Sequence, residues 1–283
     1  PYQVVTDALL KALDDGTVPW RKPWNANTGA PANMVSKQPY KGSNVFITLC
    51  AGYSSRWWLS YKQAADLGGN VKAGEKGTRI IKFSPIPEKR NAAGELTKKG
   101  GAYFSVAVVF NLEQCEGIAD PTPDFIGPIK PNEIIEKAEK IAAGYIGAPV
   151  VTYGGNRACY APGLDQINMP EMKSFNTAGE FYSTLFHEYS HSTGHSKRLN
   201  RPEIMGEISF GSGDYSREEL VAEFGAAFLC ADAGIIDTLT NSAAYIAGWK
   251  KKLRDPANSR WALEASGKAG RAADYIRGDI KKS

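Results

Sequence analysis

Hydrophobic residues recur three and four positions apart at the start of the chain, which is the spacing of one face of a helix. They are Val4, Val5, Leu9, Leu10 and Leu13, and an Asp-Asp-Gly sequence follows them. We therefore predict an amphipathic helix over 2–14.

Two apolar segments rich in β-branched and aromatic residues, 78–86 and 101–111, predict a pair of strands. The charged segment between them predicts an exposed hairpin loop. A helix is predicted ahead of these strands, starting at Ser60, because Gln63 three residues later suits a capping box.

A proline-rich segment, 119–131, has four prolines in thirteen residues. Proline lacks the backbone N–H that helices and sheets need, so a linker is predicted here. Beyond it we predict a helix over 132–147, strands around 149–153, 157–161 and 166–169, and helices over 177–193, 216–233 and 241–279. This order predicts an α+β fold of two domains, 1–120 and 132–283, joined by a linker over 121–131.

The composition is that of a folded globular protein, with 42% hydrophobic and 23% charged residues. No apolar run reaches the roughly 18 residues that a membrane helix needs, and the first residues lack the layout of a signal peptide. The four cysteines, Cys50, Cys115, Cys159 and Cys230, are scattered among apolar neighbours, which indicates reduced, buried thiols. We therefore expect a cytoplasmic protein with no membrane partner.

All three histidines fall within nine residues, in the sequence FHEYSHSTGH. Residues four apart lie one turn apart on the same face of a helix, so His187 and His191 can hold one metal ion between them. Glu188 then lies beside the ion and can accept a proton from a metal-bound water, which is the HExxH arrangement. Thr177 and Glu180 predict a capping box at the start of this helix.

A catalytic zinc takes three protein ligands and leaves one position open. The next strong helix offers Glu219 and Glu223, one turn apart, in a pattern that resembles the ExxxD of gluzincin peptidases. On that resemblance Glu219 is the third ligand and Glu223 supports a ligand histidine. The alternatives are that Glu219 only completes a capping box with Ser216, that Glu223 is the ligand, or that His195 reaches the ion after a turn of the chain. The expected ion is Zn²⁺, with Mn²⁺ as the alternative.

The expected chemistry is hydrolysis of an amide bond. The metal polarises the scissile carbonyl and activates a water, and Glu188 moves the proton. Tyr215 is a candidate for stabilising the oxyanion, with a plain surface role as the alternative. The segment 159–170 can supply a strand edge that pairs with an extended peptide.

Positive charge is concentrated in the first half of the chain. Residues 16–112 hold 14 Lys and Arg against 4 Asp and Glu, a balance of +10, whereas the rest holds 20 against 26, a balance of −6. Cations interleaved with aromatic residues, as in WRKPW and SSRWW, suit single-stranded nucleic acid, because cations follow phosphates and rings stack on bases. The alternative is that the rings belong to the core. The candidate contacts are Trp20, Arg21, Lys22, Trp24, Arg56, Trp57, Lys72 and Lys76.

Longer motifs resemble those of the ArdC-type antirestriction proteins of conjugative plasmids. They are VPWRKPW and WLSYKQAADLGGNVKAGEKGT in the first half, and FYSTLFHEYSHSTGHSKRLNR, EELVAEFGAAFLC and YIAGWKKKL in the second. The resemblance spans nearly the whole chain. It implies an N-terminal domain that binds single-stranded DNA, a C-terminal domain with a zincin-like metallopeptidase fold, and protection of incoming plasmid DNA from host restriction.

Three functions stay open from the sequence. The first is an antirestriction protein that binds single-stranded DNA and uses its metal site, with a host restriction component as one protein partner. The second is a DNA-coating protein in which the metal is structural. The third is a protease of DNA-bound proteins that single-stranded DNA activates, as in SprT-like enzymes.

Overall fold

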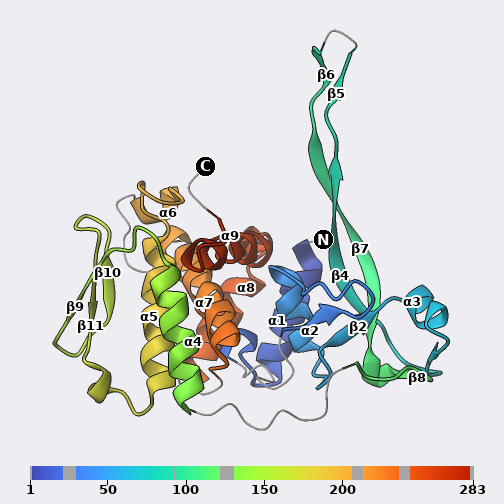
Figure 1. The fold of residues 1–283 in the computed structure, drawn as a ribbon, viewed down its shortest axis with the longest axis horizontal. Helices are drawn as coiled ribbons and strands as arrows, with labels where there is room; N and C mark the ends of the chain where they lie inside the picture. The colour runs from blue at the N-terminus through green and yellow to red at the C-terminus, as the bar shows by residue number, and fades with distance from the viewer. Residues whose placement is uncertain are drawn as a thin grey trace.

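The computed structural model describes residues 2–21, 30–91, 94–121, 131–205, 213–235 and 243–280. In the first half of the chain, short helices pack beside a four-stranded sheet (Figure 1). The helices there are α1 (Tyr2–Asp14), η1 (Pro19–Arg21), α2 (Ser43–Cys50), α3 (Tyr61–Asp66) and η2 (Leu112–Gln114). The strands are β1 (Ala32–Asn33), β2 (Trp57–Leu59), β3 (Asn70–Val71), β4 (Thr78–Ile86), β5 (Lys89–Arg90), β6 (Leu96–Lys98), β7 (Gly101–Asn111) and β8 (Cys115–Glu116).

The sheet has the order β1-β2-β7-β4, and its main feature is the antiparallel hairpin of β4 and β7. This ladder runs from the pair Thr78–Val109 to the pair Ile86–Gly101, which confirms both predicted strands. The charged segment between them is exposed as predicted, and it adds the short β5–β6 ladder. Figure 1 shows the hairpin as a long arm that leaves the body of the molecule.

The outer edge of the sheet, β4, is held by the side chain of Asn44 on α2. Its Oδ1 accepts from the N–H of Ile81 at 2.8 Å, and its Nδ2 donates to the carbonyl of Ile81 at 2.7 Å. One amide side chain thus replaces a neighbouring strand at this point of the edge.

In the second half, helices pack around the segment that carries the histidines, with a small sheet at one side (Figure 1). The helices are α4 (Pro131–Gly144), η3 (Met172–Ser174), α5 (Ala178–Ser192), α6 (Pro202–Met205), α7 (Gly213–Ala233), α8 (Ala243–Arg254), η4 (Pro256–Asn258) and α9 (Trp261–Ile276). The strands β9 (Val150–Tyr153), β10 (Cys159–Ala161) and β11 (Gln166–Met169) form a sheet of order β10-β11-β9. Among the described helices, none combines the length and the apolar character needed to cross a bilayer.

The two halves share one hydrophobic core. Leu9 on α1 and Phe46 on α2 are buried in the same cluster as Phe224 and Leu229 on α7. The ring centroids of Phe46 and Phe224 lie only 4.2 Å apart. A second, smaller cluster lies within the first half. The predicted boundary between 1–120 and 132–283 stays a prediction, because linker residues 122–130 lie outside the described ranges.

The structure forms some of the predicted helix caps and helix boundaries but not all of them. The capping box of α3 forms, because Ser60 Oγ accepts from the Gln63 N–H and the Gln63 side chain accepts from the Ser60 N–H. At α5, Thr177 caps the N–H of Glu180, but the Glu180 carboxylate turns to Asn176 instead of completing the box. The predicted helical tail is divided by η4 into α8 and α9.

Candidate metal centre

The metal centre is built on two helices that pack closely, α5 and α7. Gly225 on α7 faces Ser190 on α5, and a Cβ at Gly225 would stand 2.4 Å from Ser190 Oγ. Only glycine allows this approach, since any side chain would collide with α5. The close packing brings Glu219, six residues before Gly225, within reach of the α5 histidines.

Three side chains converge at this point: His187, His191 and Glu219. The Nε2 atoms of the two histidines are 3.1 Å apart, and the Glu219 oxygens lie 3.4 Å from His191 Nε2 and 3.7 Å from His187 Nε2. In a tetrahedral site with metal–ligand distances of about 2.0–2.1 Å, donor atoms stand about 3.3–3.4 Å apart. The three donors therefore fit a divalent ion of this size.

The charges around His191 also favour a cation. Burial by itself lowers the pKa of His191, but hydrogen bonds and charge from Glu218 and Glu219 outweigh it and raise the pKa to about 10. Two carboxylates beside a buried imidazole thus favour a positive charge, which a divalent ion supplies when it displaces the proton.

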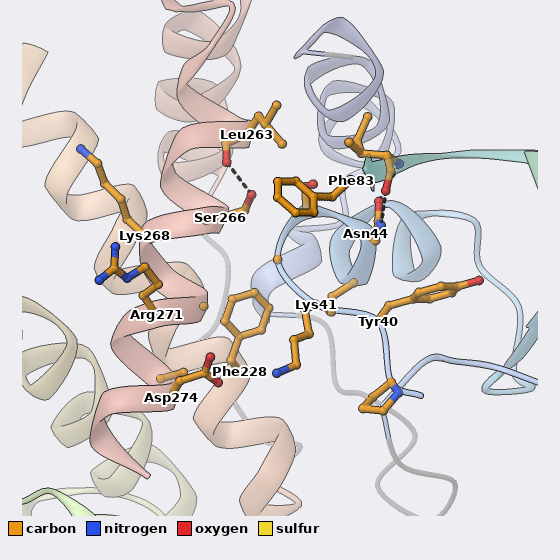
Figure 2. Close-up of a pocket in the computed structure, with 18 of the residues that line it drawn as sticks. Tyr40, Lys41, Asn44, Phe83, Phe228, Leu263, Ser266, Lys268, Arg271 and Asp274 are labelled. Carbon is orange, nitrogen blue, oxygen red and sulfur yellow. Dashed lines mark hydrogen bonds between the residues drawn. The ribbon is translucent and has the colours of Figure 1, made fainter. Parts of the chain in front are cut away.

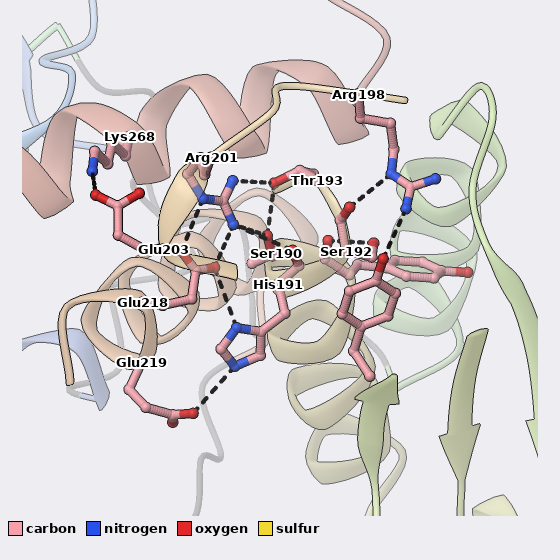
Figure 3. Close-up of polar contacts among 12 residues, drawn as sticks. Ser190, His191, Ser192, Thr193, Arg198, Arg201, Glu203, Glu218, Glu219 and Lys268 are labelled. Carbon is pink, nitrogen blue, oxygen red and sulfur yellow. Dashed lines mark hydrogen bonds and ion pairs between the residues drawn. The ribbon is translucent and has the colours of Figure 1, made fainter. Parts of the chain in front are cut away.

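Glu218 is a functional residue that the sequence analysis missed. Its Oε1 lies 3.3 Å from His191 Nδ1, while its Oε2 accepts from Arg201 Nε at 3.0 Å (Figure 3). Arg201 is itself buried and donates to Thr193 Oγ1 and to the Ser190 carbonyl. Burial opposes ionisation of Glu218, but Arg201 and His191 outweigh it and lower the pKa of this carboxyl.

At His191 the supporting carboxylate is Glu218, and the predicted support of a ligand histidine by Glu223 stays a prediction. Glu223 lies one turn beyond Glu219, half-buried and outside the three-donor cluster. Adjacent residues on a helix point about 100° apart, so Glu218 and Glu219 reach opposite sides of one imidazole. The sequence feature that could have indicated Glu218 is its position directly before the predicted ligand Glu219.

The alternatives for the third ligand can be compared with the geometry of the site. His195 is absent from the donor cluster found among the described residues; its Nδ1 accepts from the Lys197 N–H at 3.2 Å and faces Asp165 at 3.9 Å. Ser216 is not an N-cap, because α7 begins three residues earlier, at Gly213.

Glu188 is buried on α5 beside His187. The side chain of Tyr215 lies outside the described part of the molecule.

The turn after α5 is fixed by Arg198, which is 3% exposed. It donates to the Ser192 carbonyl at 2.7 Å, to the Gly147 carbonyl at 3.0 Å, and to Asp165 and Tyr160 of the β10–β11 hairpin. One guanidinium therefore ties the small sheet to the end of the histidine helix.

The predicted DNA contacts are only partly available. Trp20 is 3% exposed and packs edge-on against Phe224 and Trp249, so its predicted stacking on bases is wrong in this structure. Trp57 is also buried, and the cations of Lys37 and Arg56 lie over its ring at 4.6 and 4.7 Å.

Two other predicted contacts, Lys72 and Lys76, are exposed, and Lys72 donates to the Glu113 carbonyl at 2.8 Å. Arg56 is half-buried. Lys22 and Trp24 lie outside the described residues, as does the side chain of Arg21. Among the described residues of this half, the exposed rings are on the hairpin and α3, at Tyr61, Phe83, Tyr103 and Phe104.

Two sequence families match consecutive parts of the chain. Residues 136–266 match a zincin-like metallopeptidase family, and residues 1–110 match the N-terminal domain of anti-restriction factor ArdC. Together with the donor cluster, the first match defines an α+β protein with a zincin-like domain, which confirms the predicted fold class.

Solved structures extend the match to nearly the whole chain. The crystal structure of antirestriction protein ArdC from the R388 plasmid, in metal-free form, is 32% identical, has a TM-score of 0.73 and covers 99% of both chains. The Mn(II)-bound form is 33% identical with a TM-score of 0.74, over 97% of this chain and 96% of that one. The chain belongs to the ArdC antirestriction family, as its motifs predicted.

Relatives of known sequence fall into two groups. The Sinorhizobium fredii protein y4eC is 32% identical over 97% of this chain and 91% of its own length. Two Escherichia coli proteins named DNA primase TraC are each 33% identical over 97% and 90% of this chain. The similarity covers only 20% and 25% of those two proteins, so the chain spans about a fifth to a quarter of their length.

Proposed function

We propose that this protein binds single-stranded DNA, protects incoming plasmid DNA from restriction, and hydrolyses a peptide bond at the centre formed by His187, His191 and Glu219. The observation that carries the catalytic part is the convergence of the three donors, with Glu188 buried and next to His187 in the sequence of α5. Family membership supports the antirestriction role.

Each residue of the centre has a separate role in the proposed hydrolysis. His187, His191 and Glu219 would hold a divalent ion, which would act as a Lewis acid and lower the pKa of a water at the site. Glu188 accepts the proton of the attacking water and passes it to the leaving amine. Glu218 holds the His191 ring so that Nε2 faces the centre. The edge strand β10 is available to pair with an extended peptide.

A catalytic rather than a structural ion is supported by the exposure of the ligands. The side chains of His187 and Glu219 are 22% and 25% exposed, whereas structural zinc sites are closed by four protein ligands. The described residues offer three donors here, which leaves a position for water or substrate. We propose Zn²⁺ as the native ion because two imidazoles and a carboxylate suit it. Mn²⁺ is the alternative, since a relative's crystal structure contains Mn(II).

The decisive variant is Glu188→Gln, which removes the base and keeps the shape of the side chain. We expect it to bind metal as the wild type does, by elemental analysis, and to lose protection of transferred plasmid DNA and cleavage of candidate protein substrates. A host restriction component is the first substrate to test. Glu180→Gln is the matched control, because Glu180 lies on the same helix and its carboxylate contacts only the neighbouring Asn176 in the described structure.

Two outcomes would change the proposal. Full protection by Glu188→Gln would favour a protein that acts by coating DNA, with a structural metal. Cleavage of DNA-crosslinked proteins that appears only when single-stranded DNA is added would favour a protease of DNA-bound proteins.

A further inference from the structure

A cleft of about 720 Å³ lies between the β4–β7 hairpin and α9. Its walls come from both halves of the chain: Lys41 and Phe83 lie on one side, and Phe228 and Leu263 on the other (Figure 2). Phe104 also lines the cleft. Sites for small ligands measure about 300–1,000 Å³, so the cleft has the size of a binding site. None of its lining residues belongs to the donor cluster of the metal centre.

The hairpin wall carries exposed aromatic rings. Phe83 and Phe104 are directly paired across the ladder, 59% and 48% exposed, with ring centroids 5.7 Å apart at 61°. Large exposed rings grouped on one surface mark interaction sites, because water solvates them poorly. Such rings are also the groups on which the bases of a single strand stack.

The charge of the cleft favours an anion. Its acids are neutralised within the protein: Arg277 pairs with Asp232 at 2.6 Å and with Asp274, and Arg260 pairs with Glu264 at 3.1 Å. Two other lining cations, Lys41 and Arg271, form no ion pair with any residue that the structure describes. In Figure 2 the Lys41 side chain extends toward Phe228 and Asp274.

The α9 wall is open where a flat group would approach. Gly267 and Gly270 lie three residues apart on α9, and a Cβ added at either would meet no atom within 4 Å. Without side chains at these positions, the helix leaves room in the cleft. Exposed rings, two cations without an ion pair among the described residues, and an open wall suit a polymer with flat apolar faces and a negative backbone.

We infer that single-stranded DNA lies in this cleft, with bases on Phe83 and Phe104 and phosphates near Lys41 and Arg271. The choice of DNA rests on the proposed function, whereas the location rests on the cleft itself. A strand bound here contacts both halves of the chain. It also touches α7, which carries Phe228 at the cleft and Glu219 at the metal centre.

The test is fluorescence anisotropy of a labelled oligo(dT) with the full chain. Phe83→Leu combined with Phe104→Leu keeps apolar bulk but removes the rings, and we expect at least a tenfold loss of affinity. Tyr103→Leu is the matched control: Tyr103 is 55% exposed on the same strand, and the alternation of side chains places it on the opposite face. Its affinity should stay within twofold of the wild type.

The charge is tested by the salt dependence of binding. Lys41→Ala should weaken binding and lower the slope of log affinity against log salt by about 0.7, the value for one phosphate contact on a single strand. Lys82→Ala, which removes an exposed cation from the opposite face of β4, should leave the slope unchanged.

The results distinguish failure of the proposed binding location from failure of DNA binding itself. If the wild type binds DNA and the double leucine variant binds equally well, the location in the cleft is overturned while DNA binding stands. If the wild type itself binds no single-stranded DNA, the DNA part of the proposed function fails as well. A 2-aminopurine base that is quenched by wild type and by Phe83→Tyr, but not by Phe83→Leu, would identify the ring as the stacking partner.

Discussion

Glu218 Oε1 lies 3.3 Å from Nδ1 of His191, on the side of the imidazole opposite to Glu219. The two nitrogens of one ring are thus divided between a carboxylate that orients the ring and the cluster that holds the ion. A carboxylate in this position fixes the tautomer and increases the basicity of the ligand.

Replacing Glu218 should therefore weaken metal binding without removing a ligand. For Glu218→Gln we expect a 10- to 100-fold loss of metal affinity, of the order seen for other orienting partners. Competition with a chelating dye measures it. Glu203→Gln is the control, because Glu203 pairs with Lys268 rather than with a histidine. Equal losses in both variants would contradict the orienting role.

The approach of α5 and α7 can be tested at Gly225. Gly225→Ala places a Cβ against Ser190, so we expect a lower melting temperature and weaker metal binding. Gly248→Ala on α8 is the matched control, since its Cβ meets no atom within 4 Å. Alanine should stabilise that helix by roughly 0.5–1 kcal/mol. A Gly225→Ala protein as stable as the control would show that the helices can separate at little cost.

Acid stability should depend on Asp165. Burial opposes ionisation of this carboxyl, but Arg198, Tyr160 and Lys197 outweigh it and lower its pKa from 3.8 to about 2. Because the folded-state pKa is depressed, the stabilisation is complete above about pH 4 and is lost as the pH falls toward 2, for about 2 kcal/mol in total.

The measurement is urea unfolding between pH 7 and pH 2. Asp165→Asn should be less stable at pH 7, because Arg198 loses its partner, and should lose less between pH 4 and 2 than the wild type. Asp7→Asn, at an exposed position on α1, should follow the wild-type curve. A parallel curve for Asp165→Asn would assign acid unfolding to other groups.

Trp20 should contribute to stability rather than to DNA binding. Its ring is buried against Phe224 and Trp249, so Trp20→Ala should lower the free energy of unfolding by about 3–5 kcal/mol. Trp20→Phe should lose less. DNA affinity, measured below the melting temperature, should stay unchanged for both variants. A loss of DNA affinity without a loss of stability would support the prediction that Trp20 contacts DNA.

Local signals in the sequence predicted the elements well. The spacing in α1, the capping residues of α3 and the β-branched and aromatic residues of β4 and β7 are signals that act over a few residues, so they can be read from the chain. The HExxH pair is equally local, because His187 and His191 share one face of α5.

Distant packing was not available from the sequence. Trp20 was predicted to contact DNA, yet its ring packs on residues some two hundred positions away, Phe224 and Trp249. The spacing of Glu219 and Glu223 left Glu218 out, because the direction of each carboxylate depends on how α7 packs on α5. The sequence placed Phe83 and Phe104 on predicted strands, but it did not show which face of the sheet their rings would occupy.

Helix α1 is held by α8 and by the segment just before α9. Asp14 at the end of α1 pairs with Lys250 and Arg254 of α8, and Thr6 donates to the Ser259 carbonyl just before α9. These contacts tie the start of the described chain to its last helices, so neither half can be removed without breaking them. This agrees with the two primases, each of which matches 90% or more of this chain and not one half of it alone.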